Sequence, residues 1–101
     1  MYEGKLKDEL LDALFEAVLK LETEEECYQF FEDIATVGEI KALAQRLAVD
    51  KMLAVGETYA KISEETGAST ATISRVKRSL YYGNEGYRLI LERLGYQVAE
   101  E

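Results

Sequence analysis

The chain has 101 residues, of which 48% are hydrophobic and 32% charged, and its formal net charge is −8. This length fits one domain, and no apolar run approaches the roughly 20 residues of a membrane span. There is no histidine, which removes the usual general base and metal ligand, and the lone Cys27 excludes an internal disulfide. The sequence does not start with the positively charged and then apolar segments of a secretory signal peptide. We expect a cytoplasmic protein without catalytic residues, a metal site or membrane association.

The apolar residues recur with helical periodicity throughout, and neither a proline nor a credible strand interrupts them. A first helix is expected over 5–21, with an apolar face wider than one partner helix needs. Thr23 and Glu26 form a capping box, which predicts a second helix that runs to about Ile34. Within that helix, Cys27 is interpreted as a small buried apolar residue rather than a nucleophile.

A third helix is predicted where the same capping signal returns, at Thr36 and Glu39. It should run from about Val37 to Leu53 and end at Gly56, because glycine adopts the left-handed conformation that terminates helices. The two helices at the front of the chain and the one at its back carry more apolar surface than a helix-turn-helix alone requires.

The remaining sequence predicts three more helices, so that the whole chain, 1–101, forms a single all-α domain of six helices. Residues 58–80 indicate a helix-turn-helix. The pattern breaks at 81–83, and Asn84 is expected to cap a C-terminal helix over 84–94. The tail, 95–101, is expected to fray.

The helix-turn-helix prediction depends on local signals within TYAKISEETGASTATISRVKRSL, residues 58–80. Gly67 supplies the turn between two short helices, and Ser69 caps the second one. Three apolar residues at i, i+3 and i+7 predict the buried face of that second helix: Ile73, Val76 and Leu80.

The opposite face of the second helix carries small polar side chains followed by cations, and 68–80 contains no acidic residue. Small side chains allow a helix to approach base edges, and cations hold phosphates. This pattern predicts that the chain binds double-stranded DNA through the major groove. The predicted DNA-binding residues are Ser69, Thr70, Ala71, Ser74, Arg75, Lys77 and Arg78.

Two other interpretations stay open at this point. The net charge of −8 also suits an acidic helical protein-interaction module that docks onto a basic partner without binding DNA. The surplus apolar surface favours a homodimer in which residues 1–55 are dimerisation helices, since two-fold DNA readers match two half-sites. A monomeric bundle that buries all of that surface is the alternative.

Several residues at fixed spacing around both helices carry a family resemblance: Glu39, Ala42, Leu43, Arg46, Gly56, Glu57, Gly67, Ala68, the run Ala71-Thr72-Ile73-Ser74-Arg75, Ser79 and Leu80. On these residues, the stretch from Thr36 to Leu94 resembles the Trp repressor family, most closely its YerC/YecD-like branch. The resemblance implies an intertwined all-α homodimer. It also implies a transcription regulator whose paired recognition helices read a palindromic operator.

The resemblance further implies a small-molecule effector of amino-acid type. In the tryptophan-binding repressors two arginines sandwich the indole, and Arg46 and Arg75 stand at those positions, with Thr36 and Ser79 at hydroxyl positions. Stacking on an aromatic ring and pairing with a carboxylate are both typical of arginine. However, those repressors have glycine where this chain has Val76, whose branched side chain would fill space that an indole needs. We therefore expect no cofactor, and we expect tryptophan not to be the effector.

Overall fold

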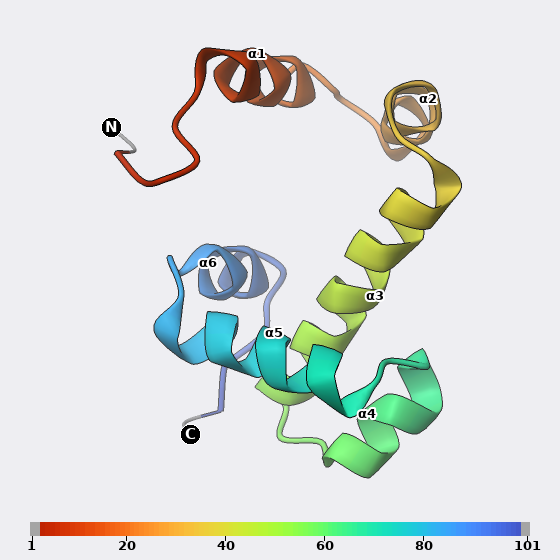
Figure 1. The fold of residues 1–101 in the computed structure, drawn as a ribbon, viewed down its shortest axis with the longest axis vertical. Helices are drawn as coiled ribbons and strands as arrows, with labels where there is room; N and C mark the ends of the chain where they lie inside the picture. The colour runs from red at the N-terminus through yellow and green to blue at the C-terminus, as the bar shows by residue number, and fades with distance from the viewer. Residues whose placement is uncertain (1–2, 100–101) are drawn as a thin grey trace. The chain divides into compact units, whose positions relative to one another are not determined.

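The computed structural model describes residues 3–99, and these contain six helices and no strand (Figure 1). The prediction of an all-α, six-helix chain is confirmed. None of the helices in this range combines the length and the apolar character of a membrane span. The chain divides into an N-terminal unit that ends at Val37 and a C-terminal unit that begins at Gly38. The helices are α1 (Glu9–Val18), α2 (Glu24–Ile34), α3 (Val37–Ala54), α4 (Tyr59–Thr66), α5 (Thr70–Tyr82) and α6 (Gly86–Arg93).

In the N-terminal unit, α1 is shorter than the predicted helix over 5–21 at both ends. Its start is set by Asp8, which has an extended backbone and whose carboxylate accepts the N–H of Leu10 at 3.1 Å. An N-cap residue of this kind satisfies a free helical N–H but is itself outside the helix. The first four residues of the predicted helix, 5–8, therefore lie outside α1.

Thr23 caps α2 as predicted, since its hydroxyl accepts the N–H of Glu26 at 3.1 Å. The return bond of the capping box is displaced by one residue. The Glu26 carboxylate accepts the N–H of Glu22 at 2.8 Å. The acidic first turn of α2 also favours the positive end of the helix dipole.

No residue between 3 and 37 is buried. Leu10 is 81% exposed, Phe15 52% and Leu19 83%, although α1 is strongly amphipathic in sequence. The interpretation of Cys27 as buried is wrong for this chain, because its side chain is exposed. The N-terminal unit therefore has apolar helix faces and no core of its own.

The C-terminal unit does have a core, to which α3, α4, α5 and α6 all contribute. Figure 1 shows α5 crossing α3, with α4 preceding it and α6 following it. The core residues are at most 7% exposed: Val49, Leu53, Ala54, Ile62, Ala68, Ile73, Val76, Leu80 and Leu91.

The end of α5 differs from its prediction. The helix continues through Tyr82 instead of breaking at 81–83, and it ends at Gly83. A Cβ atom at Gly83 would clash with the backbone carbonyl of Ser79, so only glycine fits there without a shift. Asn84 does not cap α6. Glu85 occupies the cap position with a left-handed φ of 67° and no side-chain hydrogen bond.

The prediction that the tail frays is wrong as far as residue 99, and residues 100 and 101 lie outside the described range. Tyr96 packs against the core. The N–H of Ala99 donates to the carbonyl of Ala54 at 2.8 Å, and the Tyr81 hydroxyl donates to the carbonyl of Ala99. The C-terminal segment thus connects the end of α3 to the end of α5.

Candidate nucleic-acid interface and adjoining pocket

The joint between α4 and α5 has the geometry of a helix-turn-helix, as predicted. Gly67 takes a left-handed φ of 76°, and its N–H donates to the carbonyl of Ser63 at 2.9 Å. The Thr66 hydroxyl donates to the carbonyl of Ile62 at 2.7 Å and accepts the N–H of Ala68 at 3.1 Å. The turn is therefore held by its own hydrogen bonds.

The turn is also attached to α3. The Gln45 side-chain amide donates to the carbonyl of Thr66 at 3.0 Å. This bond fixes the α4–α5 joint to the longest helix of the C-terminal unit.

Ser69 is the N-cap of α5, and its hydroxyl accepts the N–H of Thr72 at 3.1 Å. The same hydroxyl donates to the Thr72 hydroxyl at 3.2 Å. Ser69 is therefore engaged in capping the helix, and its predicted contact with DNA stays a prediction.

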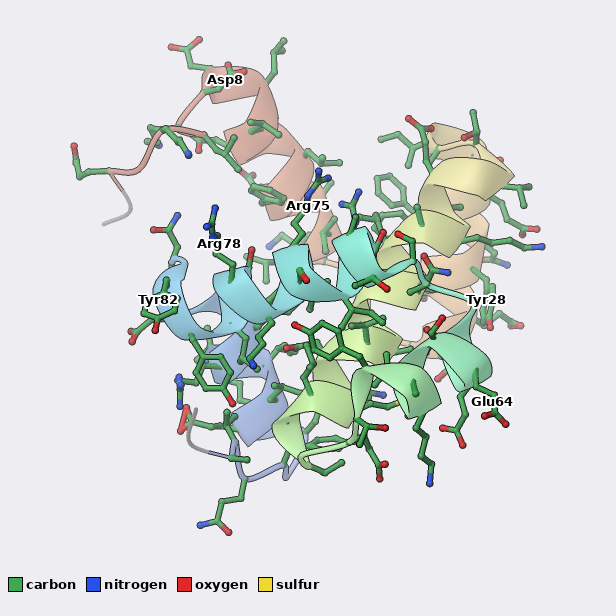
Figure 2. The ribbon with its side chains drawn as sticks, turned by 60° about the horizontal axis from the view of Figure 1, so that its bottom comes forward. Asp8, Tyr28, Glu64, Arg75, Arg78 and Tyr82 are labelled. Atoms are coloured by element: carbon green, nitrogen blue, oxygen red, sulfur yellow. The ribbon has the colours of Figure 1, made fainter. Side chains whose placement is uncertain are left out.

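The two faces of α5 differ sharply in burial. Ile73, Val76 and Leu80 are at most 2% exposed. Figure 2 shows Arg75 and Arg78 projecting from the same side of α5, opposite α4. Neither guanidinium forms a salt bridge with any residue from 3 to 99. The outer face of α5 is defined here by its exposed residues: Thr70, Ala71, Ser74, Arg75 and Arg78.

Lys77 is not part of this outer face. Its ammonium lies 5.9 Å from the centroid of the Tyr59 ring of α4, within the range of a cation–π interaction. At 100° per residue, Lys77 is turned about 200° from Arg75, so the helix separates these two cations. The structure does not place Lys77 with the other predicted DNA-binding cations.

A cavity of about 150 Å³ opens behind the outer face. It brings together three of the four predicted effector-binding residues, Arg46, Arg75 and Ser79. Thr36 belongs to the N-terminal unit and does not line this cavity, so its role stays a prediction. The full lining consists of Arg46, Thr72, Arg75, Val76, Ser79 and Tyr87.

Val76 serves both the core and the pocket wall, because it is 2% exposed and also lines the cavity. A cavity of roughly 150 Å³ is known to hold a benzene molecule. An indole is larger than benzene, and the branched side chain of Val76 occupies part of the wall. The expectation that tryptophan is not the effector stays a prediction.

A buried carboxylate lies next to this pocket. Asp50 of α3 is 0% exposed, and neither of its carboxylate oxygens has a hydrogen-bond partner among residues 3–99. Burial raises the pKa of Asp50 from 3.8 to about 6. Burial also raises the pKa of Tyr87, and the negative charge of Asp50 raises it further, while Arg46 lowers it.

The family comparison agrees with this geometry. The family model described as Trp repressor protein matches residues 9–95. The chain belongs to the Trp repressor family. The match begins near the start of α1, whereas the residue pattern alone had carried the resemblance only from Thr36 onward.

Three individual proteins are similar to the chain over nearly its whole length. The uncharacterized protein YerC of Bacillus subtilis (strain 168) is 58% identical over 94 residues, which cover 93% of this chain and 90% of YerC. A crystal structure of a candidate Trp repressor from Staphylococcus aureus is 58% identical, with a TM-score of 0.88 over 94% of this chain and 95% of that one. A TrpR-like protein from Eubacterium eligens ATCC 27750 is 54% identical, with a TM-score of 0.87 over 94% and 98%.

Sequence reasoning missed two residues of this family member's pocket region, Asp50 and Tyr87. Asp50 falls in the apolar stripe of α3, where Leu43, Leu47 and Ala54 recur at helical spacing. An acid in such a stripe is a detectable signal, because charged residues are rarely fully buried without a partner. Tyr87 carried no comparable signal, since only the packing of α6 places it beside the pocket.

Proposed function

We propose that this chain is a sequence-specific DNA-binding transcriptional regulator that inserts α5 into the major groove. One observation carries the proposal: the outer face of α5 combines three small exposed side chains with two unpaired arginines, while its other face is buried. A helix with this division can approach base edges closely and still be held by a folded body.

The residues of the outer face divide by chemistry into two groups. Arg75 and Arg78 are suited to phosphate contacts, because a guanidinium pairs with phosphate in a planar, bidentate manner. Thr70, Ala71 and Ser74 are suited to base edges, with hydroxyls for hydrogen bonds and a methyl group for thymine. Short side chains read few bases directly, so DNA shape and bridging water supply part of the specificity.

The acidic body does not oppose this function. The net charge is −8, but 68–80 contains no acidic side chain. The reading helix can therefore attract phosphates although the whole chain is acidic. The acidic remainder of the chain should weaken binding to non-specific DNA more than binding to an operator through α5, because acidic faces repel phosphates.

The exposed apolar faces of α1 and α2 support an intertwined homodimer. Leu10, Leu19 and Tyr28 are each at least 66% exposed, and a second copy is the simplest partner that covers them. A two-fold dimer presents two copies of α5, which matches a palindromic operator with half-sites about 34 Å apart.

The pocket provides a route for regulation. Arg75 belongs to the outer face of α5 and also lines the cavity beside Arg46 and Ser79. A small molecule bound there would redirect the Arg75 side chain and the angle of α5, and it would shift binding only by its differential affinity for the two states.

Selection of bound duplexes from a random DNA library tests the proposed function. We expect enrichment of a palindrome with half-sites about one helical turn apart. The library should be selected with and without added tryptophan, and enrichment that required tryptophan would contradict our reading of Val76. Absence of duplex binding at low salt, together with one stoichiometric protein partner, would favour the acidic interaction module instead.

Arginine variants then locate the binding face. Arg75→Ala and Arg78→Ala should each weaken operator binding by about tenfold and lower the salt dependence by about one ion, since each removes a phosphate contact. Arg93→Ala, at the exposed end of α6, is the matched control with the same charge change. Equal affinities for all three variants, measured by fluorescence anisotropy, would contradict the assignment of α5.

A further inference from the structure

The reading helix α5 is attached to the C-terminal segment, residues 95–99, through a tyrosine in its last turn. The Tyr81 hydroxyl donates to the backbone carbonyl of Ala99, which lies 18 residues further along the chain. Tyr81 is half-buried and packs against the core, so this hydrogen bond is partly shielded from water. A shielded hydrogen bond holds two elements together more strongly than an exposed one.

The C-terminal segment is itself fixed to the rest of the C-terminal unit. Tyr96 and Val98 pack against the core. The N–H of Tyr96 donates to the carbonyl of Leu91 on α6 at 2.9 Å. The N–H of Ala99 donates at 2.8 Å to the carbonyl of Ala54, which is the last residue of α3. One residue of the segment, Ala99, therefore joins the end of α5 to the end of α3.

A cation of α6 restrains the ring that forms this attachment. The guanidinium carbon of Arg88 lies 5.7 Å from the centroid of the Tyr81 ring, within the range of a cation–π interaction. The ring is thus held by α6 while its hydroxyl reaches the C-terminal segment. This restraint lowers the side-chain entropy that the hydrogen bond would otherwise cost.

Two hydrogen-bonded attachments, one at each end, hold the α4–α5 pair to α3. At the turn, the Gln45 amide donates to the carbonyl of Thr66 at 3.0 Å. At the far end of α5, Ala99 joins Tyr81 to Ala54. Gln45 and Ala54 are nine residues apart on α3, which separates them by about 13 Å along its axis. A helix attached at one end can pivot, whereas attachments at both ends fix its direction.

We propose that Tyr81 is a positioning residue for DNA recognition, because its bond to the C-terminal segment sets the direction of α5 relative to α3. The inference rests on the proposed function, in which two copies of α5 read two half-sites about 34 Å apart. With one α5 seated in its half-site, a rotation of about 10° relative to α3 would displace the second copy by about 6 Å. That displacement is nearly two base pairs. The attachment therefore controls which half-site spacing the dimer accepts.

Two other roles for Tyr81 predict different behaviour on DNA. A residue that only stabilises the core would lower the free energy of unfolding, but the folded molecules would keep their spacing preference. A residue that contacts a phosphate would contribute equally at every spacing, because each half-site would supply the same contact. A positioning residue instead changes the relative affinity for different spacings.

Tyr81→Phe tests the proposal on the full chain, because it removes the hydroxyl and keeps the ring that Arg88 and the core contact. Duplexes carry the half-sites selected by the wild type, at the selected spacing and with one or two base pairs added or removed. Fluorescence anisotropy gives the affinities. We expect the wild type to prefer its own spacing by at least about tenfold. Tyr81→Phe should reduce that preference about fivefold, the factor expected for one lost hydrogen bond.

Tyr96→Phe is the matched control. It removes the same atom from a tyrosine of the C-terminal segment that also packs against the core, and it leaves both bonds of Ala99 in place. It should keep the wild-type spacing preference. The same spacing preference in Tyr81→Phe and Tyr96→Phe would overturn the proposal, as would an equal loss of affinity at every spacing in Tyr81→Phe.

A second measurement needs no DNA. Residual dipolar couplings of the backbone amides give the orientation of α5 relative to α3 in the free protein. In Tyr81→Phe, the couplings of α5 should no longer fit the wild-type orientation, whereas those within α3 should. Couplings that fit the wild-type orientation in both helices would overturn the proposal.

Failure of this inference and failure of the proposed function give different results. A wild-type chain that selects no operator overturns both of them. An operator that the wild type and Tyr81→Phe bind with the same spacing preference overturns only the role of Tyr81.

Discussion

Both units of the chain consist of amphipathic helices, but the apolar residues are exposed in one unit and buried in the other. Residues 3–37 contain two amphipathic helices and no buried residue, whereas residues 38–99 bury an apolar core that draws on four helices. Leu10 in the first unit is 81% exposed, and Ile73 in the second is 0% exposed. Helical periodicity alone did not distinguish the exposed apolar face of α1 from the buried apolar face of α5.

The difference shows that an apolar stripe identifies a face that needs a partner but not where the partner comes from. In the C-terminal unit the partner helices follow within the same chain and are joined by short turns. In the N-terminal unit the apolar area is too large for the helices that carry it. This unit is therefore the place where a second copy would contribute most.

A charge placed on the exposed face of α1 should have the largest effect on the molecule. Leu10→Lys should dissociate the proposed dimer, because each subunit loses about 1.5–3 kcal/mol of buried leucine and gains a desolvated ammonium. Sedimentation equilibrium should then give the monomer mass of 11.4 kDa. Circular dichroism should still report a folded C-terminal unit.

Glu16→Lys is the matched control, since Glu16 is also exposed on α1 but has no apolar side chain to lose. It should leave the mass of the assembly unchanged. If Leu10→Lys sedimented like the wild type, the apolar face of α1 would not be a subunit interface.

Within the buried C-terminal unit, Asp50 should make the stability depend on pH. Its pKa is raised from 3.8 to about 6, so between those values the folded state binds more protons than the unfolded state. Stability contributed by protonated Asp50 is complete below about pH 4 and is lost as the pH rises through about 6. At about 1.4 kcal/mol per pKa unit, the loss is on the order of 3 kcal/mol.

Asp50→Asn should remove this pH dependence. Urea denaturation at pH values on either side of the transition should show the variant gaining stability over the wild type as the pH rises from about 4 to 7. A constant difference across this range would mean that Asp50 has an ordinary pKa in the folded protein.

A smaller effect is expected at the glycine that ends α5. Gly83→Ala should destabilise the chain by about 1–3 kcal/mol, because its Cβ would meet the Ser79 carbonyl, which is backbone and cannot move freely. Gly86→Ala is the control: no atom lies within 4 Å of a Cβ there, and alanine is the better helix former. Thermal melts that ranked the two variants in the opposite order would contradict the described end of α5.

The sequence could predict some parts of this structure and not others. Short-range signals succeeded: Thr23 and Ser69 cap their helices, and Gly67 makes the turn with a positive φ. Such signals act within about one helical turn, so they are readable without knowledge of the fold. The prediction that Asn84 caps α6 was wrong, because Glu85 occupies the cap position with a left-handed backbone.

Long-range features were beyond the same reasoning. The tail is held because the N–H of Ala99 donates to the carbonyl of Ala54, and no local pattern predicts a bond between such distant residues. Of the candidate site, sequence could predict the outer face of α5 and three pocket residues. It could not predict that Lys77 turns toward Tyr59, since that depends on how α4 packs against α5.

The smallest predicted effect concerns the bond that holds the reading helix to α3. Gln45→Ala removes the hydrogen bond to the carbonyl of Thr66, which should weaken the α4–α5 joint by about 1 kcal/mol. The amide protons of Gly67 and Ala68 should then exchange about fivefold faster. The helices have their own caps and core contacts, so their amides should exchange as before.

Lys41→Ala is the control for Gln45→Ala, because Lys41 is exposed on the same helix and exchange at the joint should not respond to it. Gln45 lies on α3, outside the outer face of α5, and is not among the residues that line the pocket. Any loss of operator affinity in Gln45→Ala would therefore measure how much the orientation of α5, rather than its contacts, contributes to reading DNA. Unchanged exchange at Gly67 would instead show that the hydrogen bonds within the turn suffice to hold the joint.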